Sequence, residues 1–138
     1  GEIAVITNIP RTATVTAESP VTVLRLTSVS MQHVIHDNHT LEDKLWQIAA
    51  PRLAENILSE ITPYSKMQHS DILKMLSKGE LILAKKVRNI DLKDKTVILI
   101  TWKAIKSDDE NVEAPCLIDD KSITLSRDSR LFLFTYNK

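Results

Sequence analysis

Two segments in the last third of the chain constrain the fold more than any other feature. They are residues 96–102 (TVILITW) and 131–134 (LFLF), and both are apolar on the two faces that a strand would present. A strand of this kind needs a covering layer on each side, and its β-branched and aromatic residues favour an extended backbone. The sequence therefore predicts a layered β domain with these segments as interior strands.

The predicted β domain begins after Gly79 and follows a short helix. Ser70 is the expected N-cap of that helix, which has one apolar side and ends at Gly79. The acidic run 108–111 is expected to form a solvated hairpin loop, because it lacks the residue spacing of a calcium loop. The expected strands are about 80–87, 96–105, 112–118, 122–125 and 130–136.

The start of the chain predicts a different arrangement. Apolar residues in 1–9 favour one or two helical turns. The segments 12–17 and 21–26 are rich in β-branched residues, so each predicts a strand. The turn signal at 18–20 would join the two strands into an antiparallel hairpin.

Helices are predicted after this hairpin. One short helix begins near Ser28 and ends near residues 37–38, and Thr40 is the expected N-cap of a longer helix over about 41–61. Pro51 interrupts the apolar pattern of the longer helix. Either the helix bends there, or a new helix opens with Pro51 in its first turn, where a missing N–H costs little.

Composition excludes several classes of protein. The 138 residues carry 18 Lys or Arg and 18 Asp or Glu, and this zero net charge disfavours a dedicated nucleic-acid binder. With only Gly1 and Gly79, the chain has no glycine-rich nucleotide loop. Cys116 is the single cysteine, which excludes an internal disulfide and favours a reducing, intracellular compartment. No apolar run reaches the roughly 20 residues that span a bilayer. The chain starts without an initiator Met, and we expect it to be a piece of a longer protein.

One segment near the start combines groups that suit an anion with a neighbouring hydroxyl. A helix that begins after Gly1 would direct free N–H groups outward, and Gly1 has no Cβ to keep a ligand away. Arg11 offers a planar fork that matches a phosphate. Glu2 can accept hydrogen bonds from a vicinal hydroxyl such as a ribose 2′-OH. Together these groups would suit a cyclic nucleotide.

The residues GEIA at 1–4 and PRTATV at 10–15 closely resemble the phosphate-binding cassette of cyclic-nucleotide-binding domains. Such domains occur in protein kinase A regulatory subunits, hyperpolarisation-activated channels and bacterial catabolite activator proteins. The spacing from Glu2 to Arg11 matches the eukaryotic members. Two predicted strands, a short helix and a long helix follow, as they do in the family.

The resemblance implies a role for each matching residue. Gly1 would open the cassette, Glu2 would hold the ribose 2′-OH and Arg11 the cyclic phosphate. A hydroxyl at Thr12 would contact a syn guanine, which adds cGMP to cAMP as a candidate ligand. The cradle would be completed by the backbone N–H groups of Ile3, Ala4 and Ala13. The family's lid contact would come from the helix over 41–61, with Leu53 and Ile57 as candidate residues.

The resemblance also implies a domain organisation. Residues 1–62 would be only the C-terminal half of a cyclic-nucleotide-binding β-roll, with cassette, hairpin and lid helices. The family's first β-roll strands normally precede the cassette, and this chain lacks them. Residues 63–138 would form a small β-rich, jelly-roll-like domain without a second cassette. The expected fold class is therefore mixed α+β.

The segment 41–52 (LEDKLWQIAAPR), together with the β-rich tail, looks most like the cytosolic end of the sperm-specific sodium/proton exchanger family. This narrower resemblance implies a regulatory module that binds cAMP and modulates a membrane exchanger. The implied partners are the transmembrane part of the same polypeptide and a second copy in a homodimer, without nucleic acid. The implied location is the cytoplasmic side of the plasma membrane, in the sperm flagellum.

Two other functions stay open. One is an assembly scaffold with a degenerate cassette, and the other is the regulatory end of a cyclic-nucleotide-gated channel. An enzyme is not expected, because no catalytic triad, metal set or paired carboxylates emerge. A metal is not expected either, and solvated or capping roles are favoured for His33, His36, His39 and His69.

The segment 66–106 is basic, with ten Lys or Arg against four Asp or Glu. Three interpretations are open for it. It would contact acidic lipid, or the acidic 107–120 segment of another subunit, or it would form a solvated β surface, which the sequence favours.

Overall fold

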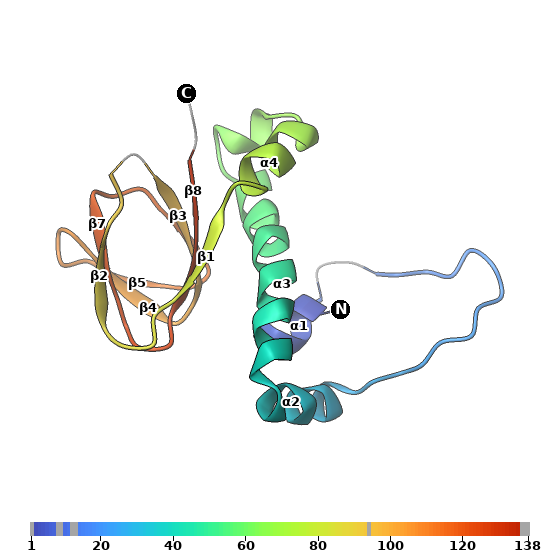
Figure 1. Cartoon of the computed structure of the whole chain (residues 1–138). Helices are drawn as coiled ribbons and strands as arrows, with labels where there is room; N and C mark the ends of the chain where they lie inside the picture. The colour runs from blue at the N-terminus through green and yellow to red at the C-terminus, as the bar shows by residue number, and fades with distance from the viewer. Residues whose placement is uncertain (1, 8–9, 12–13, 94, 136–138) are drawn as a thin grey trace. The chain divides into compact units, whose positions relative to one another are not determined.

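The computed structural model describes residues 2–7, 10–11, 14–93 and 95–135, and Figure 1 labels the elements in chain order. The helical elements are α1 (Glu2–Thr7), α2 (Ser28–Asp37), α3 (His39–Ser59), the 3₁₀ turn η1 (Tyr64–Lys66) and α4 (His69–Leu76). The strands are β1 (Glu80–Leu83), β2 (Arg88–Asp91), β3 (Thr96–Thr101), β4 (Lys103–Lys106), β5 (Asn111–Glu113), β6 (Cys116–Ile118), β7 (Ser122–Leu125) and β8 (Arg130–Phe134).

The chain divides into two compact units, Gly1–Ala49 and Ala50–Lys138. The division falls inside α3, whereas the boundary expected from the sequence follows residue 62. The assignment of 1–62 to part of a cyclic-nucleotide-binding domain stays a prediction. None of the described helices is both long and apolar enough to cross a membrane.

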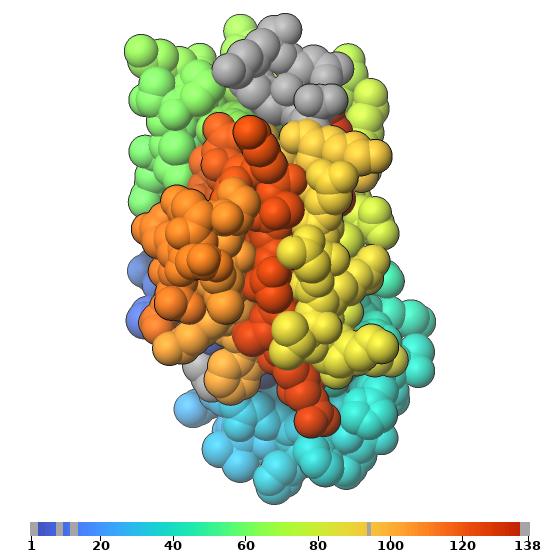
Figure 2. Space-filling model, turned by 90° about the vertical axis from the view of Figure 1, so that its left-hand side faces the viewer, coloured from blue at the N-terminus to red at the C-terminus, as the bar shows by residue number. Residues whose placement is uncertain are grey.

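The described residues of the second unit form eight antiparallel strands in two four-stranded sheets. The first sheet has the order β1-β8-β3-β6, and the second has the order β2-β7-β4-β5. Figure 2 shows the outer face of the second sheet, with β7 between β2 and the β4–β5 hairpin. Two packed sheets of four strands are the arrangement found in jelly rolls. The expected mixed α+β class is confirmed, and its β part has two antiparallel sheets.

The apolar segments 96–102 and 131–134 contain the two interior strands of the first sheet, β3 and β8. Strand β3 pairs with β8 on one side and with β6 on the other. Alternate residues of β3, such as Val97 and Leu99, face the core between the sheets, while Ile98 and Ile100 are also buried. The prediction that this segment is covered on both faces is confirmed for residues 97–100, whereas Trp102 at its end is exposed. The core between the sheets consists of Ala84, Leu92, Val97, Leu99, Ala104, Ile118, Ile123, Leu125, Leu131 and Leu133.

Aromatic rings of β8 pack against the helical segment that precedes the sheets. The rings of Phe134 and Tyr64 lie edge to face, with their centroids 6.2 Å apart. Phe132 is buried, and a Cβ built on Gly79 would collide with its ring. Edge-to-face pairs add to the stability that burial provides. Gly79 is therefore needed for its lack of a side chain, which lets the Phe132 ring lie against the backbone.

Two of the expected strands are each divided into a pair of shorter strands in the structure. The expected strand 96–105 divides because Trp102 adopts a φ of 67°, where the backbone leaves β3 and enters β4. The expected strand 112–118 divides at Pro115, which has no N–H for a ladder. The short strand β2 was missed, because only Ile90 of its four residues is apolar. The acidic run 108–111 does lie at the hairpin between β4 and β5, as predicted.

The helices agree with the sequence analysis except at their caps. Helices α1 and α2 lie where the apolar patterns predict, and α3 continues through Pro51 as one helix. Asn38, rather than Thr40, caps α3, because the Oδ1 of Asn38 accepts a hydrogen bond from the backbone N–H of Leu41 at 3.0 Å. The predicted Ser70 cap is also wrong. Ser70 lies inside α4, and Gln68 occupies the cap position without a side-chain hydrogen bond.

The predicted hairpin over 12–17 and 21–26 is wrong for the residues that the structure describes. Residues 14–26 form no strand, and the side chains of Val15, Val23 and Leu24 are 93%, 73% and 103% exposed. Residues 12 and 13 lie outside the described part. A two-stranded hairpin is marginal in water unless a third strand or a helix covers its apolar face. Within the described chain no such layer covers this segment, so strand propensity alone does not produce the hairpin.

Gly79→Ala tests the close contact between the chain at Gly79 and the Phe132 ring. The added methyl group has to displace a buried ring, so we expect a loss of about 1–3 kcal/mol in the free energy of unfolding. Urea denaturation measures the change. Lys78→Ala is the matched control, because Lys78 is exposed and adjacent. Equal stability of the two variants would contradict the packing described.

Candidate functional site

The first part of the predicted cassette lies in helix α1. Glu2 opens this helix, and Ile3 and Ala4 are half-buried in its first turn. The hydroxyl of Thr7 donates a hydrogen bond of 2.6 Å to the carbonyl of Ile3. Gly1 and the side chain of Glu2 lie outside the described part. The structure thus describes the backbone of three cassette residues and the helix that carries them.

Arg11 is the one charged residue of the cassette whose side chain lies in the described part of the structure. It is exposed, as is Pro10 before it. No described residue forms a hydrogen bond or an ion pair with Arg11. The next two cassette residues, Thr12 and Ala13, lie outside the described part. A guanidinium without a protein partner is available to an anion, and its planar fork suits a phosphate.

The two candidate lid residues lie in the other compact unit. Leu53 is buried and Ile57 is half-buried, both on α3. The cassette belongs to Gly1–Ala49, whereas these two residues belong to Ala50–Lys138. Their role as a lid stays a prediction.

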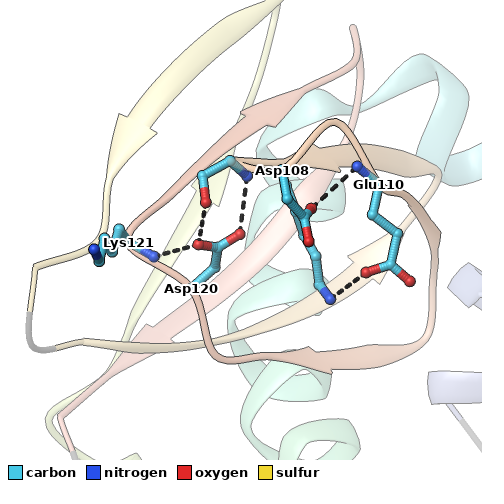
Figure 3. A network of polar contacts seen from close by, with 6 residues as sticks. Asp108, Glu110, Asp120 and Lys121 are labelled. Carbon is cyan, nitrogen blue, oxygen red and sulfur yellow. Dashed lines mark hydrogen bonds and ion pairs between the residues drawn. The ribbon is translucent and has the colours of Figure 1, made fainter.

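A polar network that the sequence did not predict joins two loops of the β domain (Figure 3). Asp120, from the loop between β6 and β7, accepts hydrogen bonds from the Ser107 hydroxyl at 2.5 Å and the Ser107 N–H at 2.9 Å. The backbone N–H of Lys121 donates a third, at 2.6 Å. The Ser107 hydroxyl, with the two N–H groups, lowers the pKa of Asp120 below its ordinary value of 3.8. The network therefore ties the β4–β5 loop to the β6–β7 loop.

A second carboxylate in this network is also engaged. Glu110 forms an ion pair with Lys106, and this hydrogen bond raises the pKa of the lysine. The Oδ1 of Asp108 accepts from the Glu110 N–H at 3.1 Å. The carboxylate oxygens of Asp108 and Glu110 are used in contacts that hold the loop together. They therefore do not converge on a common point as ligands of a metal ion would. Within the described residues, no group of three or more His, Cys, Asp or Glu is placed to hold a metal ion.

The remaining titratable candidates lie apart from one another. His36 contacts Asp37 at 3.2 Å, and His69 contacts Glu55 at 2.8 Å. Cys116 is half-buried, and the loss of solvent around its thiol raises the thiol's pKa, which disfavours the reactive thiolate. None of these residues forms a catalytic pair in the described chain. Arg11 and the Asp120 network are therefore the two polar features that need an explanation.

Comparison with known proteins identifies no family, because no protein-family model matches the chain. Two solved structures from Pseudomonas aeruginosa are similar in part. The sensor domain of the transcriptional regulator DNR matches with a TM-score of 0.40 and 12% identity, over 58% of this chain and 72% of that chain. A structure of DNR itself matches with a TM-score of 0.40 and 10% identity, over 60% and 47% of the two chains. A likeness at this level assigns neither a ligand nor a function.

Asp120→Asn tests the polar network through pH. Because the folded-state pKa of Asp120 is lowered, its carboxylate stabilises the fold above the ordinary pKa of 3.8, and this contribution is lost as the pH falls through the lowered value. We expect Asp120→Asn to unfold at lower urea than the wild type at neutral pH, with the difference shrinking in acid.

Asp119→Asn is the matched control, since Asp119 is exposed and directly adjacent. It should leave the urea midpoint unchanged at both pH values. If the two variants behave alike across the pH range, the Ser107–Asp120 contact does not stabilise the fold.

Proposed function

We propose that residues 1–13 bind the sugar-phosphate of a cyclic nucleotide, and that the chain is a regulatory module. The proposal rests on the cassette pattern, in which Glu2 and Arg11 have the spacing of eukaryotic cyclic-nucleotide-binding domains. The observation that carries it is the exposed Arg11 guanidinium, which has no partner among the described residues. An arginine committed to a structural ion pair would not be available to a ligand.

Each cassette residue has a distinct task in this proposal. Arg11 neutralises the cyclic phosphate, and Glu2 accepts a hydrogen bond from the ribose 2′-OH. Backbone N–H groups of Ile3, Ala4 and Ala13 donate to the phosphate oxygens. We expect cAMP as the ligand, and the Thr12 hydroxyl makes cGMP the second candidate.

Regulation requires a change that depends on the ligand. In the proposed mechanism the lid is the helix α3, through Leu53 and Ile57. Leu53 is buried, so the two lid positions must differ in which residues or ligand atoms cover its side chain. The nucleotide shifts the balance only by its difference in affinity for the two positions, typically about 1–3 kcal/mol of coupling.

The narrower proposal concerns the protein that the module regulates. The resemblance of residues 41–52 to sperm-specific sodium/proton exchangers supports a membrane transporter as the regulated part of the same polypeptide. In that setting the module would act as a homodimer on the cytoplasmic side of the plasma membrane. Ion transport with and without added cAMP is the corresponding assay.

The second candidate function is an assembly scaffold whose cassette binds nothing. It is favoured by the exposed apolar side chains of 14–26, with Leu24 fully exposed in the described structure. Such side chains would become buried when another chain pairs with this segment. A scaffold of this kind would keep the same thermal stability and oligomeric state with and without cAMP.

Arg11→Ala in the intact protein tests the proposed function. The loss of a charge-assisted hydrogen bond costs about 1.5–3 kcal/mol, so calorimetric titration should show a fall of at least roughly 10-fold in cAMP affinity. Arg25→Ala is the matched control, because Arg25 is an exposed arginine of the same unit outside the cassette.

Wild-type cAMP affinity in Arg11→Ala would overturn the assigned role of Arg11. A wild-type protein that binds no cyclic nucleotide would instead favour the scaffold.

A further inference from the structure

One end of the β domain brings together four connections that are far apart in the sequence. The Ala84 N–H bonds to the Ser129 carbonyl at 2.9 Å, which joins the β1–β2 connection to the β7–β8 connection. The Ser126 N–H bonds to the Lys103 carbonyl at 3.2 Å. The Ala114 N–H bonds to the Trp102 carbonyl at 2.8 Å, which adds the β5–β6 connection. We call this the basic end, formed by residues 84–88, 102–103, 113–115 and 126–129.

The basic end carries an excess of exposed positive charge. Its two carboxylates are already paired, Glu113 with Lys103 at 2.5 Å and Asp128 with Arg127 at 3.5 Å. The β1–β2 connection and the first residue of β2 contribute three more exposed cations, and no described residue forms an ion pair with them. Figure 2 shows this connection, in yellow, beside the β7–β8 connection, in red, at the lower end of the sheet. The three unpaired cations are Lys85, Lys86 and Arg88.

Two large apolar side chains are exposed within the same end. Val87 lies between Lys86 and Arg88 and is 66% exposed, and Trp102 is 63% exposed. Trp102 also has a φ of 67°, a backbone conformation that bulky residues rarely adopt. Residues held in such conformations cluster at sites with a function. The fold does not bury either side chain, so their apolar character has no role in the core.

The opposite end of the same domain has the opposite character. Its loops carry the Asp120 and Glu110 network, and those carboxylates already accept hydrogen bonds from Ser107, Lys106 and Lys121. Charge is therefore segregated along the strand direction. Lys85, Lys86, Arg88 and the exposed Trp102 belong to the same end, whereas the exposed Lys93, Lys95 and Lys121 lie among the acidic loops of the other end.

We propose that the basic end docks on the anionic surface of a lipid bilayer. Lysine and arginine near a membrane are attracted to anionic headgroups, and tryptophan is enriched where headgroups meet acyl chains. Lys85, Lys86 and Arg88 supply the first interaction, and Trp102 with Val87 supplies the second. Two such contributions together give binding that neither gives alone.

The observations favour a bilayer over two other partners. A single-stranded nucleic acid needs successive aromatic platforms, and this end exposes Trp102 with an aliphatic Val87 instead. A second copy that placed its acidic end here would form a head-to-tail contact, which generates rings or open filaments rather than the two-fold dimer that is commonest. At the acidic end, the carboxylates of Asp120 and Glu110 already accept hydrogen bonds within the chain. The bilayer proposal does not depend on nucleotide binding, because no residue of 1–13 takes part in it.

Vesicle co-sedimentation of the 138-residue chain tests the proposal. We expect binding to phosphatidylcholine vesicles that contain roughly 30% phosphatidylserine, weak binding to pure phosphatidylcholine, and release as salt is raised. Lys85→Glu with Lys86→Glu should lower the affinity by roughly 30-fold or more, since each lysine near such a surface contributes about a fivefold factor. Lys95→Glu with Lys121→Glu is the matched control, because it changes the charge equally at the opposite end and should bind like the wild type.

Trp102→Asn provides a second, uncharged variant at the same end. Asn tolerates a positive φ, so this substitution keeps the backbone while removing the ring. It should weaken vesicle binding while leaving the salt dependence in place. Weaker vesicle binding by either variant at the basic end supports the proposal, provided that the circular dichroism of the variant matches that of the wild type.

Three results of the binding experiments would overturn the proposal. They are a wild-type chain that does not sediment with anionic vesicles at low salt, an equal loss of binding in the control pair, and binding to single-stranded RNA without binding to vesicles. A change in sedimentation coefficient caused by the Lys85 and Lys86 substitutions, without any effect on vesicle binding, would point to self-association and would equally contradict it.

Discussion

The pairing of β3 with β8 is the interaction on which the second unit depends. Both strands are buried on both faces, so each needs neighbours within the sheet and a layer above and below it. The second sheet provides one layer. Tyr64 and the chain at Gly79 meet the aromatic rings of β8 on the other side. The strand order that satisfies these needs also assigns the connections to the two ends, and thereby separates Lys85 from Asp120.

The segment before α2 shows what happens to similar residues without such a layer. Residues 14–26 include Val15, Val21 and Val23, yet the described part of this segment forms no strand. β-Propensity measures how well a side chain fits a pleated, half-buried surface, and these side chains are exposed instead. The proposed nucleotide cassette directly precedes this segment.

The sequence predicts those features that local patterns determine. The apolar periods locate α1, α2 and the interior strand β3, because burial on a face leaves a period in the residues. The break at Trp102 could not be predicted, since a bulky residue gives no signal of a positive φ. The basic end could not be predicted either, because only the pairing of the strands brings the chain at Ala84 to Asp128 and Ser129. Of the candidate site, the sequence identifies Glu2 and Arg11 by family resemblance, while their joint action on a ligand depends on contacts that no local pattern encodes.

The central claim is that Glu2 and Arg11 hold the sugar and the phosphate of one cyclic nucleotide. Calorimetric titration of the intact wild-type protein with cAMP and with 2′-deoxy-cAMP tests it most directly, because the two ligands differ only in the hydroxyl assigned to Glu2. We expect cAMP to bind at least roughly 10-fold more tightly, since the deoxy ligand leaves a carboxylate without its hydrogen bond. Equal affinities, or no binding of either nucleotide, would contradict the account.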